Sequence, residues 1–252
     1  MSLHCQRLGD GPDLVLLHGW GLHSGIWDGV AERLADRFRV HLIDLPGHGH
    51  SAPPAEFDLD GVCDLLVEAV PAGAHWLGWS LGGTLAVGVA ARFPARVARL
   101  VLVAANPRFV AAPDWPAAMQ PEILEGFGRD MMRDHRATLM RFLSLVARGA
   151  PDGTVLRRLR AALQAAPSPT MEALRGGLGI LRDADLRPAL ETLDAPVLWL
   201  GGARDTLVPI EALRAVAARH PAMRLQEFAA AGHAPFVSHP VEFVGAVQEF
   251  LS

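Results

Sequence analysis

Short apolar runs that alternate with helical patterns constrain the fold of this chain more than any other feature. Six such runs, each bounded by turn residues, read as buried strands. Strands that are apolar on both faces and separated by helices form a parallel sheet with helices on both sides. We therefore expect an α/β protein with a mostly parallel central sheet. The expected strands are 14–17, 38–43, 74–79, 97–104, 196–200 and 223–228, and the expected helices between them are 26–37, 59–70, 81–92, 209–219 and 240–251.

The stretch 108–185 breaks this alternation. It has no convincing strand, and four amphipathic helices are expected in it, at 121–132, 138–146, 153–165 and 170–181. An insertion of this length is too long for a plain crossover between two strands. We interpret 108–185 as a helical cap over the carboxyl ends of the strands, where open α/β sheets bind ligands, and 1–107 with 186–252 as the core. The alternative is that these helices belong to the outer layer of the sheet.

Composition excludes several classes of protein. The chain has 252 residues, half of them hydrophobic, which suits one large soluble domain with or without an insertion. A net charge of −4 argues against a nucleic-acid binder driven by bulk charge. No run approaches the roughly 18 apolar residues needed to span a bilayer, and the first residues contain no apolar leader. The two cysteines, Cys5 and Cys63, lie outside any metal-type spacing. We expect a reduced, cytoplasmic protein with no metal, no membrane segment and no nucleic-acid partner.

Ser80 lies in the strongest local motif, Gly78-Trp79-Ser80-Leu81-Gly82-Gly83, between an expected strand and an expected helix. That context is the one a G-x-S-x-G nucleophile elbow requires. A strand that turns at once into a helix strains the serine backbone and brings neighbouring backbone close, so Gly78 and Gly82 must lack a Cβ atom. The motif predicts Ser80 as a nucleophile. The alternative is a turn in which Ser80 only caps the helix.

A serine nucleophile needs a base, and the base needs an acid that orients it. Asp205 follows the expected strand 196–200, where the acid of this fold should lie. His233 follows the last expected strand, in the loop that should carry the base. We predict Asp205 and His233 as the partners of Ser80, although Asp205 could instead be a turn or helix-cap residue.

The loop after the first expected strand, His18-Gly19-Trp20-Gly21, is predicted to supply one of two oxyanion N–H groups, from Trp20. The other comes from Leu81, the residue after the nucleophile. His18 is interpreted as a structural residue that holds this loop by hydrogen bonds, with a competing base as the alternative. The Gly- and Pro-rich stretch 44–51 is interpreted as a tight turn of the scaffold.

Taken together, these residues resemble the α/β-hydrolase superfamily, and the likeness spans the whole chain. More selective segments resemble one family within it, the pimeloyl-[acyl-carrier protein] methyl ester esterases. The selective features are Trp20, the tryptophan before Ser80, and Ala-Pro-Phe after His233. The segments that carry this likeness are 16–22, 76–83, 141–143, 176–181 and 231–240.

The resemblance implies a serine carboxylesterase of biotin biosynthesis. Such an enzyme hydrolyses the methyl ester of pimeloyl-[acyl-carrier protein] to pimeloyl-[acyl-carrier protein] and methanol, with a Ser-His-Asp triad and no metal or organic cofactor. It also implies an acyl channel lined by Trp20, Leu81 and Phe142. Because Trp79 is another large apolar residue at a strand end, some members of this group are expected to face the ligand and not the core.

The same resemblance implies that arginines of the cap contact the acidic carrier protein. Arg141 and Arg158 occupy positions where the family has arginine, whereas two further positions are Ala137 and Thr154 here, with Arg136 and Arg157 nearby. Composition supports this patch independently, since residues 129–160 hold eight arginines and three acidic residues in a chain of net charge −4. The alternative is that these arginines form salt bridges or only solvate their helices. We expect Arg136, Arg141, Arg157 and Arg158 to make the carrier contacts, and the protein to be a monomer.

Two other functions stay open at this point. The first is a general short-chain carboxylesterase, lactonase or C–C hydrolase with the same triad, because fold and triad do not fix the substrate. The second is a non-catalytic ligand receptor on the same scaffold, against which an intact Ser80, Asp205 and His233 argue.

Overall fold

A seven-stranded sheet forms the centre of the computed structural model, which describes residues 2–54 and 56–252. Its strands run in the order β1-β3-β2-β4-β5-β6-β7, and every neighbouring pair is parallel except β1 and β3. The expected α/β fold with a mostly parallel sheet is therefore confirmed. The strands are β1 (Cys5–Leu8), β2 (Asp13–Leu17), β3 (Arg39–Ile43), β4 (Ala74–Trp79), β5 (Val97–Val103), β6 (Val197–Gly202) and β7 (Arg224–Phe228).

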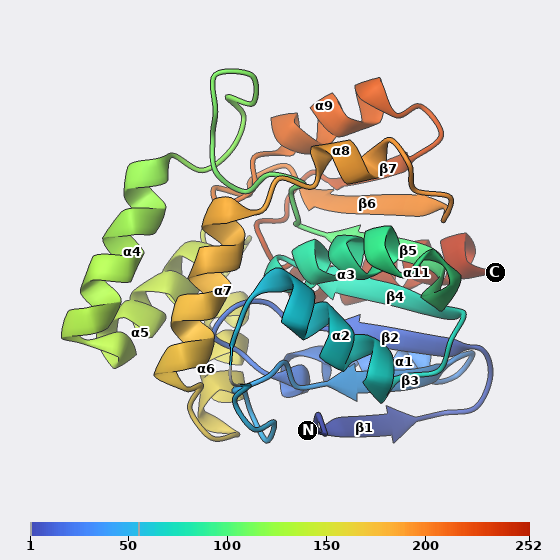
Figure 1. Ribbon diagram of the computed structural model, residues 1–252, viewed down its shortest axis with the longest axis horizontal. Helices are drawn as coiled ribbons and strands as arrows, with labels where there is room; N and C mark the ends of the chain where they lie inside the picture. Colours follow the sequence, from blue (N-terminus) through green and yellow to red (C-terminus); the bar gives the residue numbers. More distant parts are fainter. Residues whose placement is uncertain (1, 55) are drawn as a thin grey trace.

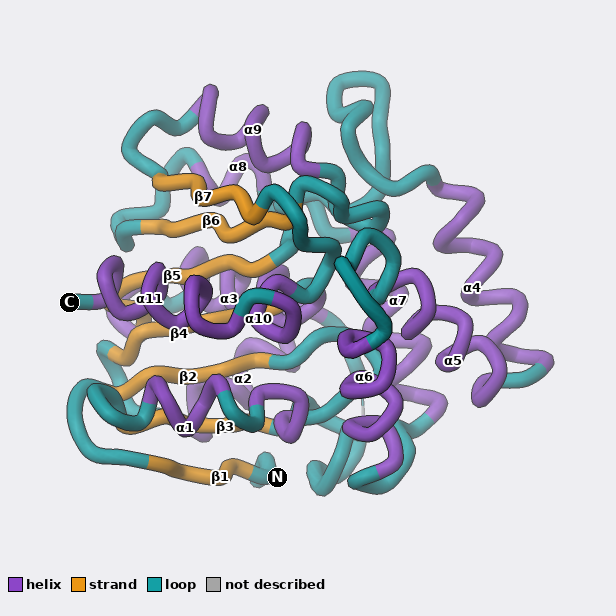
Figure 2. Tube along the Cα trace, turned by 180° about the vertical axis from the view of Figure 1, so that it is seen from behind, coloured by secondary structure: helices purple, strands orange, loops and turns teal. Residues whose placement is uncertain are grey.

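Helices cover both faces of the sheet. Figure 1 shows α2, α3 and α8 on one face, and Figure 2, seen from behind, shows α1 and α11 on the other. The helices outside 108–185 are α1 (Val30–Leu34), α2 (Leu59–Ala69), α3 (Leu81–Arg92), α8 (Arg187–Leu190), α9 (Ile210–Arg219), α10 (Pro235–Ser238) and α11 (Pro240–Leu251), with 3-10 turns at Ser24–Trp27 and Pro94–Arg96.

Four helices lie between β5 and β6 in the chain: α4 (Pro121–Arg133), α5 (His135–Val146), α6 (Thr154–Gln164) and α7 (Met171–Asp183). In the described part of this segment, pairing of the β type is limited to isolated bridges such as Arg108 with Asp185. Figure 1 places the four helices together at the left, where the arrowheads of the parallel strands point. They therefore stand at the carboxyl ends of the sheet.

The apolar strands form the core because both of their faces are covered. Every side chain of Leu14–Leu17 has an exposed fraction of 0%, and so has every one of Leu100–Val103. Leu16 lies opposite Leu42 of β3 and Leu77 of β4, so apolar residues continue from strand to strand. Burial of such apolar surface is the main stabilising term of the fold.

One expected helix is wrong in its extent. The stretch 26–37 was expected as a single helix, but it contains the end of a 3-10 turn and the five-residue α1. Gly29 stands between them with φ of 78°, a left-handed backbone conformation that ends one helix before the next begins. No helix among the described residues is both long and apolar enough to cross a membrane.

Candidate active site

Ser80 lies at the sharp turn between β4 and α3, with φ of 54° and ψ of −118°. A positive φ in a residue other than glycine is a strained conformation. A Cβ atom on Gly78 would lie 2.3 Å from the carbonyl oxygen of Gly82, and one on Gly82 would lie 2.5 Å from that of Leu17. The steric need for both glycines is thus confirmed. The Ser80 side chain makes no capping hydrogen bond to α3, so the interpretation of Ser80 as only a helix cap is wrong.

Asp205 and His233 form a buried hydrogen-bonded pair. His233 Nδ1 lies 2.7 Å from Asp205 Oδ2, and each side chain is 1% exposed. Because a carboxylate only accepts hydrogen bonds, Nδ1 carries the proton of the neutral imidazole, which leaves a free lone pair on Nε2. The other carboxylate oxygen, Asp205 Oδ1, accepts from the backbone N–H groups of Leu207 and Val208 at 2.8 and 3.0 Å. Asp205 therefore does both things that the sequence allowed: it holds its own turn and faces the imidazole.

Trp79 fixes the His233 loop against the serine turn. Its Nε1–H donates to the backbone carbonyl oxygen of His233 at 2.8 Å, and the two rings lie 5.6 Å apart. Trp79 also packs on Phe236 and Trp27, with ring centroids 5.1 and 6.5 Å away. We grouped Trp79 with side chains that could face the ligand, but the structure places it behind the histidine. Sequence reasoning missed this positioning role, because the partners of Trp79 are distant in the chain.

His233 Nε2 is buried and forms no hydrogen bond within residues 2–54 and 56–252, with Ser80 or with any other group. An unpaired nitrogen in a buried position is costly unless it has a use. Hydrogen bonds between a catalytic base and its nucleophile often tighten only when substrate is bound. The pair is therefore arranged to accept a proton at Nε2.

The loop that follows β2 is held by His18. His18 Nδ1 bonds to the carbonyl oxygen of Gly19 at 2.8 Å, and Nε2 accepts the backbone N–H of Leu45 at 2.9 Å. Complete burial, together with the nearby His48, lowers the pKa of His18 to about 3. Both ring nitrogens are engaged and the ring is neutral, so the structural interpretation of His18 is confirmed.

The turn 44–51 is scaffold, as expected. Asp44 accepts from the backbone N–H groups of Ser24 and His50 at 2.8 and 2.9 Å. Burial opposes ionisation of this carboxyl, yet these hydrogen bonds hold the pKa of Asp44 below its ordinary value. The Ser51 hydroxyl donates to the carbonyl oxygen of Asp44 at 2.6 Å and closes the turn.

The predicted oxyanion residues lie next to each other. Since Gly82 packs on the carbonyl groups of Leu17 and His18, the start of α3 touches the loop that carries Trp20. Among the described residues, neither the backbone N–H of Trp20 nor that of Leu81 donates a hydrogen bond to another protein group. Two free N–H groups on adjacent segments form the kind of donor pair that can stabilise an oxyanion.

The three predicted acyl-channel residues also come together. The rings of Trp20 and Phe142 meet edge to face at 4.9 Å, and Trp20 Nε1–H donates to the carbonyl oxygen of Leu174 in α7 at 2.8 Å. Gly177 lies against Trp20 and Leu81, because a Cβ atom at Gly177 would be 2.7 Å from Trp20 Cδ1 and 3.1 Å from Leu81 Cδ2. Sequence reasoning missed the part played by Gly177. The signal was a Gly-Gly pair in the middle of an expected helix.

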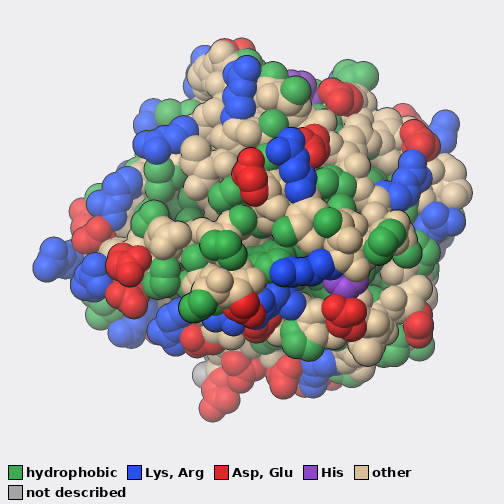
Figure 3. All heavy atoms as spheres, turned by 90° about the horizontal axis from the view of Figure 1, so that it is seen from above, with side chains coloured by type: hydrophobic (Ala, Val, Ile, Leu, Met, Phe, Trp, Pro, Cys, Tyr) green, Lys and Arg blue, Asp and Glu red, His purple; other side chains and the backbone are tan. Residues whose placement is uncertain are grey.

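The predicted carrier-contact arginines lie on α5 and α6. Arg136, Arg141 and Arg157 are exposed, and Arg158 is half-buried beside Gly29. Arg141 pairs with Asp130 and lies over the Phe127 ring, and Arg157 donates to Thr154 Oγ1 at 2.9 Å. Figure 3 shows many blue side chains, mixed with fewer red ones, at the left end of the molecule where these helices lie. Within the described residues, no group of three or more His, Cys, Asp or Glu side chains is arranged to hold a metal ion.

Comparison with known proteins agrees with this geometry. Residues 12–240 match a family described as the alpha/beta hydrolase fold. The chain is 46% identical to the pimeloyl-[acyl-carrier protein] methyl ester esterase of Sodalis glossinidius, over 99% of this chain and 98% of that protein. It is 44% identical to the protein of the same name from Xanthomonas campestris pv. campestris, over 99% of each. An esterase structure from Exiguobacterium antarcticum has the same fold, with a TM-score of 0.88 at 22% identity over 98% of this chain and 94% of that one. The chain therefore belongs to the α/β-hydrolase fold family and, within it, to the family of the pimeloyl-[acyl-carrier protein] methyl ester esterases.

Proposed function

We propose that the chain hydrolyses the methyl ester of pimeloyl-[acyl-carrier protein] to the free carboxylate and methanol, in biotin biosynthesis. It is a carboxylic ester hydrolase in which Ser80 is the nucleophile, His233 the general base and Asp205 the residue that orients the base. One observation carries these assignments. Asp205 occupies Nδ1 of the buried His233 and Nε2 has no partner among the described residues, while Trp79, the neighbour of Ser80, holds the His233 backbone. The substrate rests on the identity with esterases of that name.

The first half of the reaction forms an acyl-enzyme. His233 Nε2 takes the proton of the Ser80 hydroxyl as Oγ attacks the ester carbonyl carbon, and Asp205 stabilises the imidazolium that results. The oxyanion is held by the N–H groups of Trp20 and Leu81, each of which contributes about 3 kcal/mol to lowering the barrier. The intermediate then breaks its bond to the methoxy oxygen, which leaves as methanol with the proton from His233.

The second half releases the product. Water attacks the acyl carbonyl carbon while His233 again takes the proton, and Ser80 leaves with that proton restored to Oγ. The chain supplies every group that this cycle needs, since proton transfer and oxyanion binding use only side chains and backbone N–H groups. No cofactor takes part in the proposal.

The segment 108–185 is proposed to act as a cap over this site, on a core of 1–107 and 186–252. Its helices supply Phe142 and Gly177, both of which pack on Trp20. The acyl chain would lie against Trp20, Leu81 and Phe142, and Arg136, Arg141, Arg157 and Arg158 would meet the carrier protein. A cytoplasmic location and a monomeric state are part of the same proposal.

Mass spectrometry of pimeloyl-carrier-protein methyl ester tests the activity directly. Incubation with the purified protein is expected to remove one methylene unit from the mass of the carrier-bound chain, and incubation with the Ser80→Ala variant is expected to leave it unchanged. Equal rates on the carrier-bound ester and on small free methyl esters would instead favour a general carboxylesterase. Failure of a serine-directed phosphonate to label Ser80 would favour a non-catalytic receptor.

A further inference from the structure

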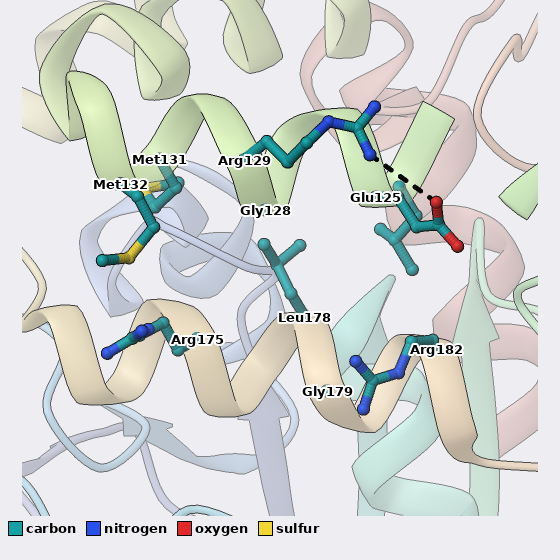
Figure 4. Close-up of a pocket in the computed structure, with 10 residues that line it drawn as sticks. Glu125, Gly128, Arg129, Met131, Met132, Arg175, Leu178, Gly179 and Arg182 are labelled. Carbon is teal, nitrogen blue, oxygen red and sulfur yellow. Dashed lines mark ion pairs between the residues drawn. The ribbon is translucent and has the colours of Figure 1, made fainter. Parts of the chain in front are cut away.

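The outer side of the helical segment carries a groove between α4 and α7, with a volume of about 620 Å³ (Figure 4). Leu124 and Met131 lie at its base and are almost completely buried. In Figure 4, Leu178 projects from α7 toward α4, and the Met132 side chain lies at one end. Met132 is 59% exposed, so a large apolar side chain faces water here. The volume is within the range of small-molecule sites.

Two glycines keep this groove open although packing does not require them. Gly128 of α4 and Gly179 of α7 line the groove, and among the described residues a Cβ atom on either would lie within 4 Å of nothing beyond its chain neighbours and its own helix backbone. Both lie inside helices, where alanine would be the more stable residue. Gly177 differs from them, because Trp20 and Leu81 leave no room for its Cβ. The absence of side chains at 128 and 179 therefore widens the groove without serving helix packing.

The groove has one cation without a partner. Arg129 pairs with Glu125 at 3.6 Å, as the dashed line in Figure 4 marks, and Arg182 pairs with Asp183 at 2.7 Å. Arg175 is exposed and forms no ion pair within the described residues. Figure 4 shows Arg175 on α7 at the same end of the groove as Met132. An apolar channel thus ends at a single free positive charge.

We propose that this groove binds a medium-chain fatty acid as its anion, with the methylene chain between the two helices and the carboxylate on Arg175. Besides its charged groups, the lining has no side chain that could hydrogen-bond to a ligand. A peptide or a nucleotide would bury polar groups there without partners, whereas a methylene chain has none to bury. The site is independent of the proposed function, since none of its lining residues belongs to the triad, the oxyanion pair or the acyl channel.

Isothermal titration of the whole protein with decanoate, below its micelle concentration, tests the proposal. One decanoate per chain is expected to bind, and 1-decanol, which has neither the charge nor an ester bond, is expected to bind more weakly. Arg175→Glu and Gly128→Leu should each raise the Kd roughly tenfold or more, through loss of the cation and of the channel respectively. Arg33→Glu and Gly245→Leu are matched controls. They change an exposed arginine and an exposed helical glycine outside the groove, and should leave the Kd unchanged.

Three results would overturn the proposal. One is the absence of decanoate binding. Another is binding that survives Gly128→Leu but disappears when Ser80 carries a phosphonate, which would place decanoate only at the candidate active site. The third is a dimer in sedimentation that Gly128→Leu abolishes, which would make a second copy the occupant. If Gly128→Leu does not fold, Met132→Glu tests the same channel, because that exposed side chain can change without disturbing the core.

Discussion

Two buried histidines near the carboxyl ends of the strands differ in what their ring nitrogens can do. His18 donates through Nδ1 and accepts through Nε2, and burial lowers its pKa to about 3. His233 uses only Nδ1, and its Nε2 has no partner in the part of the chain that the structure describes. A proton can therefore be accepted at His233 without breaking a hydrogen bond, whereas at His18 it would displace the Leu45 N–H. Hydrogen bonding, more than burial, separates the proposed base, His233, from the structural residue His18.

Substitution of Ser80 or His233, the two residues that exchange a proton in the proposed mechanism, is expected to abolish most of the activity. Ser80→Ala and His233→Ala should lower kcat to similar extents, about 10⁴-fold or more, because these residues act as a unit. Asp205→Asn should cost about 10⁴-fold, because it holds the wrong tautomer of His233. Turnover of the carrier-bound ester measures this, and thermal unfolding should show folded proteins. Near-normal kcat in His233→Ala would disprove our assignment of the base.

Phe142 is expected to affect both stability and substrate length. Its ring packs on Trp20 at 4.9 Å and on Phe127 at 5.8 Å, so Phe142→Ala should reduce the free energy of unfolding by about 3 kcal/mol. If the ring also lines the acyl channel, the milder Phe142→Leu should weaken the binding of long acyl esters by about 1–3 kcal/mol more than that of acetyl esters. Comparison of kcat/KM for the two ester lengths decides this. Equal losses for both would identify Phe142 as a core residue only.

His48 is expected to make the fold sensitive to acid. It is fully buried, its Nδ1 bonds to the carbonyl oxygen of Pro46 at 3.0 Å, and burial lowers its pKa to about 4. The unfolded chain, with a histidine pKa of about 6.5, then binds more protons than the folded one. The contribution of His48 to the free energy of unfolding is therefore fully present above about pH 6.5. It is lost as the pH falls toward 4, by up to about 1.4 kcal/mol per pH unit.

Urea unfolding at several pH values between about 7 and 5 measures this slope. His48→Asn keeps a donor for the Pro46 carbonyl but does not titrate, so its stability should depend less on pH. His18, whose pKa is also lowered and whose ring lies 5.2 Å from that of His48, leaves part of the slope in the variant. An unchanged slope in His48→Asn would show that His48 is not the group responsible.

At the scale of elements, the sequence predicted strands β2 to β7 but not the antiparallel edge strand β1. β2 to β7 begin and end within two residues of their expected limits. In β2 to β6 most side chains are buried, so most positions are apolar, whereas β7 at the opposite edge of the sheet is mostly half-buried. β1, Cys-Gln-Arg-Leu, pairs only with β3 and is largely exposed, so it has no apolar run to detect. α8 and α10 were missed for a different reason: four residues are too few to show helical periodicity.

The same division applies to the candidate site. The Ser80 turn could be predicted because its tight backbone requires glycine at nearby positions, and glycine is visible in the sequence. The hydrogen bond from Trp79 to His233 was not readable, because it joins residues 154 positions apart. The spacing of residues in a sequence predicts local geometry well, whereas contacts between distant segments can be known only once the fold is known.

At the scale of elements, Asp185 connects the two ends of the helical segment 108–185 to the chain that follows it. It accepts hydrogen bonds from Arg108 at the start of the segment at 2.7 Å and from Arg187 after it at 2.6 and 2.8 Å. Hydrogen bonds from Arg187, opposed by partial burial and helped by Arg108, hold the pKa of Asp185 well below its usual value. Its contribution is therefore constant from neutral pH down to about pH 4 and is lost only in stronger acid.

Asp185→Ala is expected to lower the free energy of unfolding by about 1–3 kcal/mol, since within the described residues it leaves Arg108 without an ion pair and Arg187 with Asp114 alone. Asp183→Ala is the matched control. This neighbouring carboxylate is exposed and, among residues 2–54 and 56–252, pairs only with the adjacent Arg182, so its loss should cost less than about 0.5 kcal/mol. Denaturant unfolding of both variants gives the comparison. Equal effects at the two positions would mean that Asp185 does not tie the segment to the core.

At the scale of the whole molecule, the chain has a negative net charge but one segment of it is strongly positive. The chain carries −4 overall, yet residues 129–160 hold eight arginines and three acidic residues. A local field of this kind attracts an acidic partner over distances comparable to the Debye length, about 10 Å at 0.1 M salt. Intramolecular pairs do not cancel it, because within the described residues they engage two of these arginines, Arg129 with Glu125 and Arg141 with Asp130. The helical segment can therefore guide association even where single contacts are weak.

Reversal of Arg141 and Arg158 to Glu together is expected to raise KM for the carrier-bound ester and to leave hydrolysis of a small free ester unchanged. A single exposed pair contributes only about 0.2–1 kcal/mol, so one substitution can be nearly silent, but the double reversal shifts the local charge by four units.

Arg7→Glu with Arg33→Glu is the control, because it changes the net charge equally at exposed positions outside the helical segment. Salt should reproduce the effect on the native protein, since the Debye length shrinks to about 3 Å at 1 M. If the control pair raised KM as much, the effect would come from net charge and not from this surface. If neither salt nor the double reversal changed KM, the arginines would only solvate their helices.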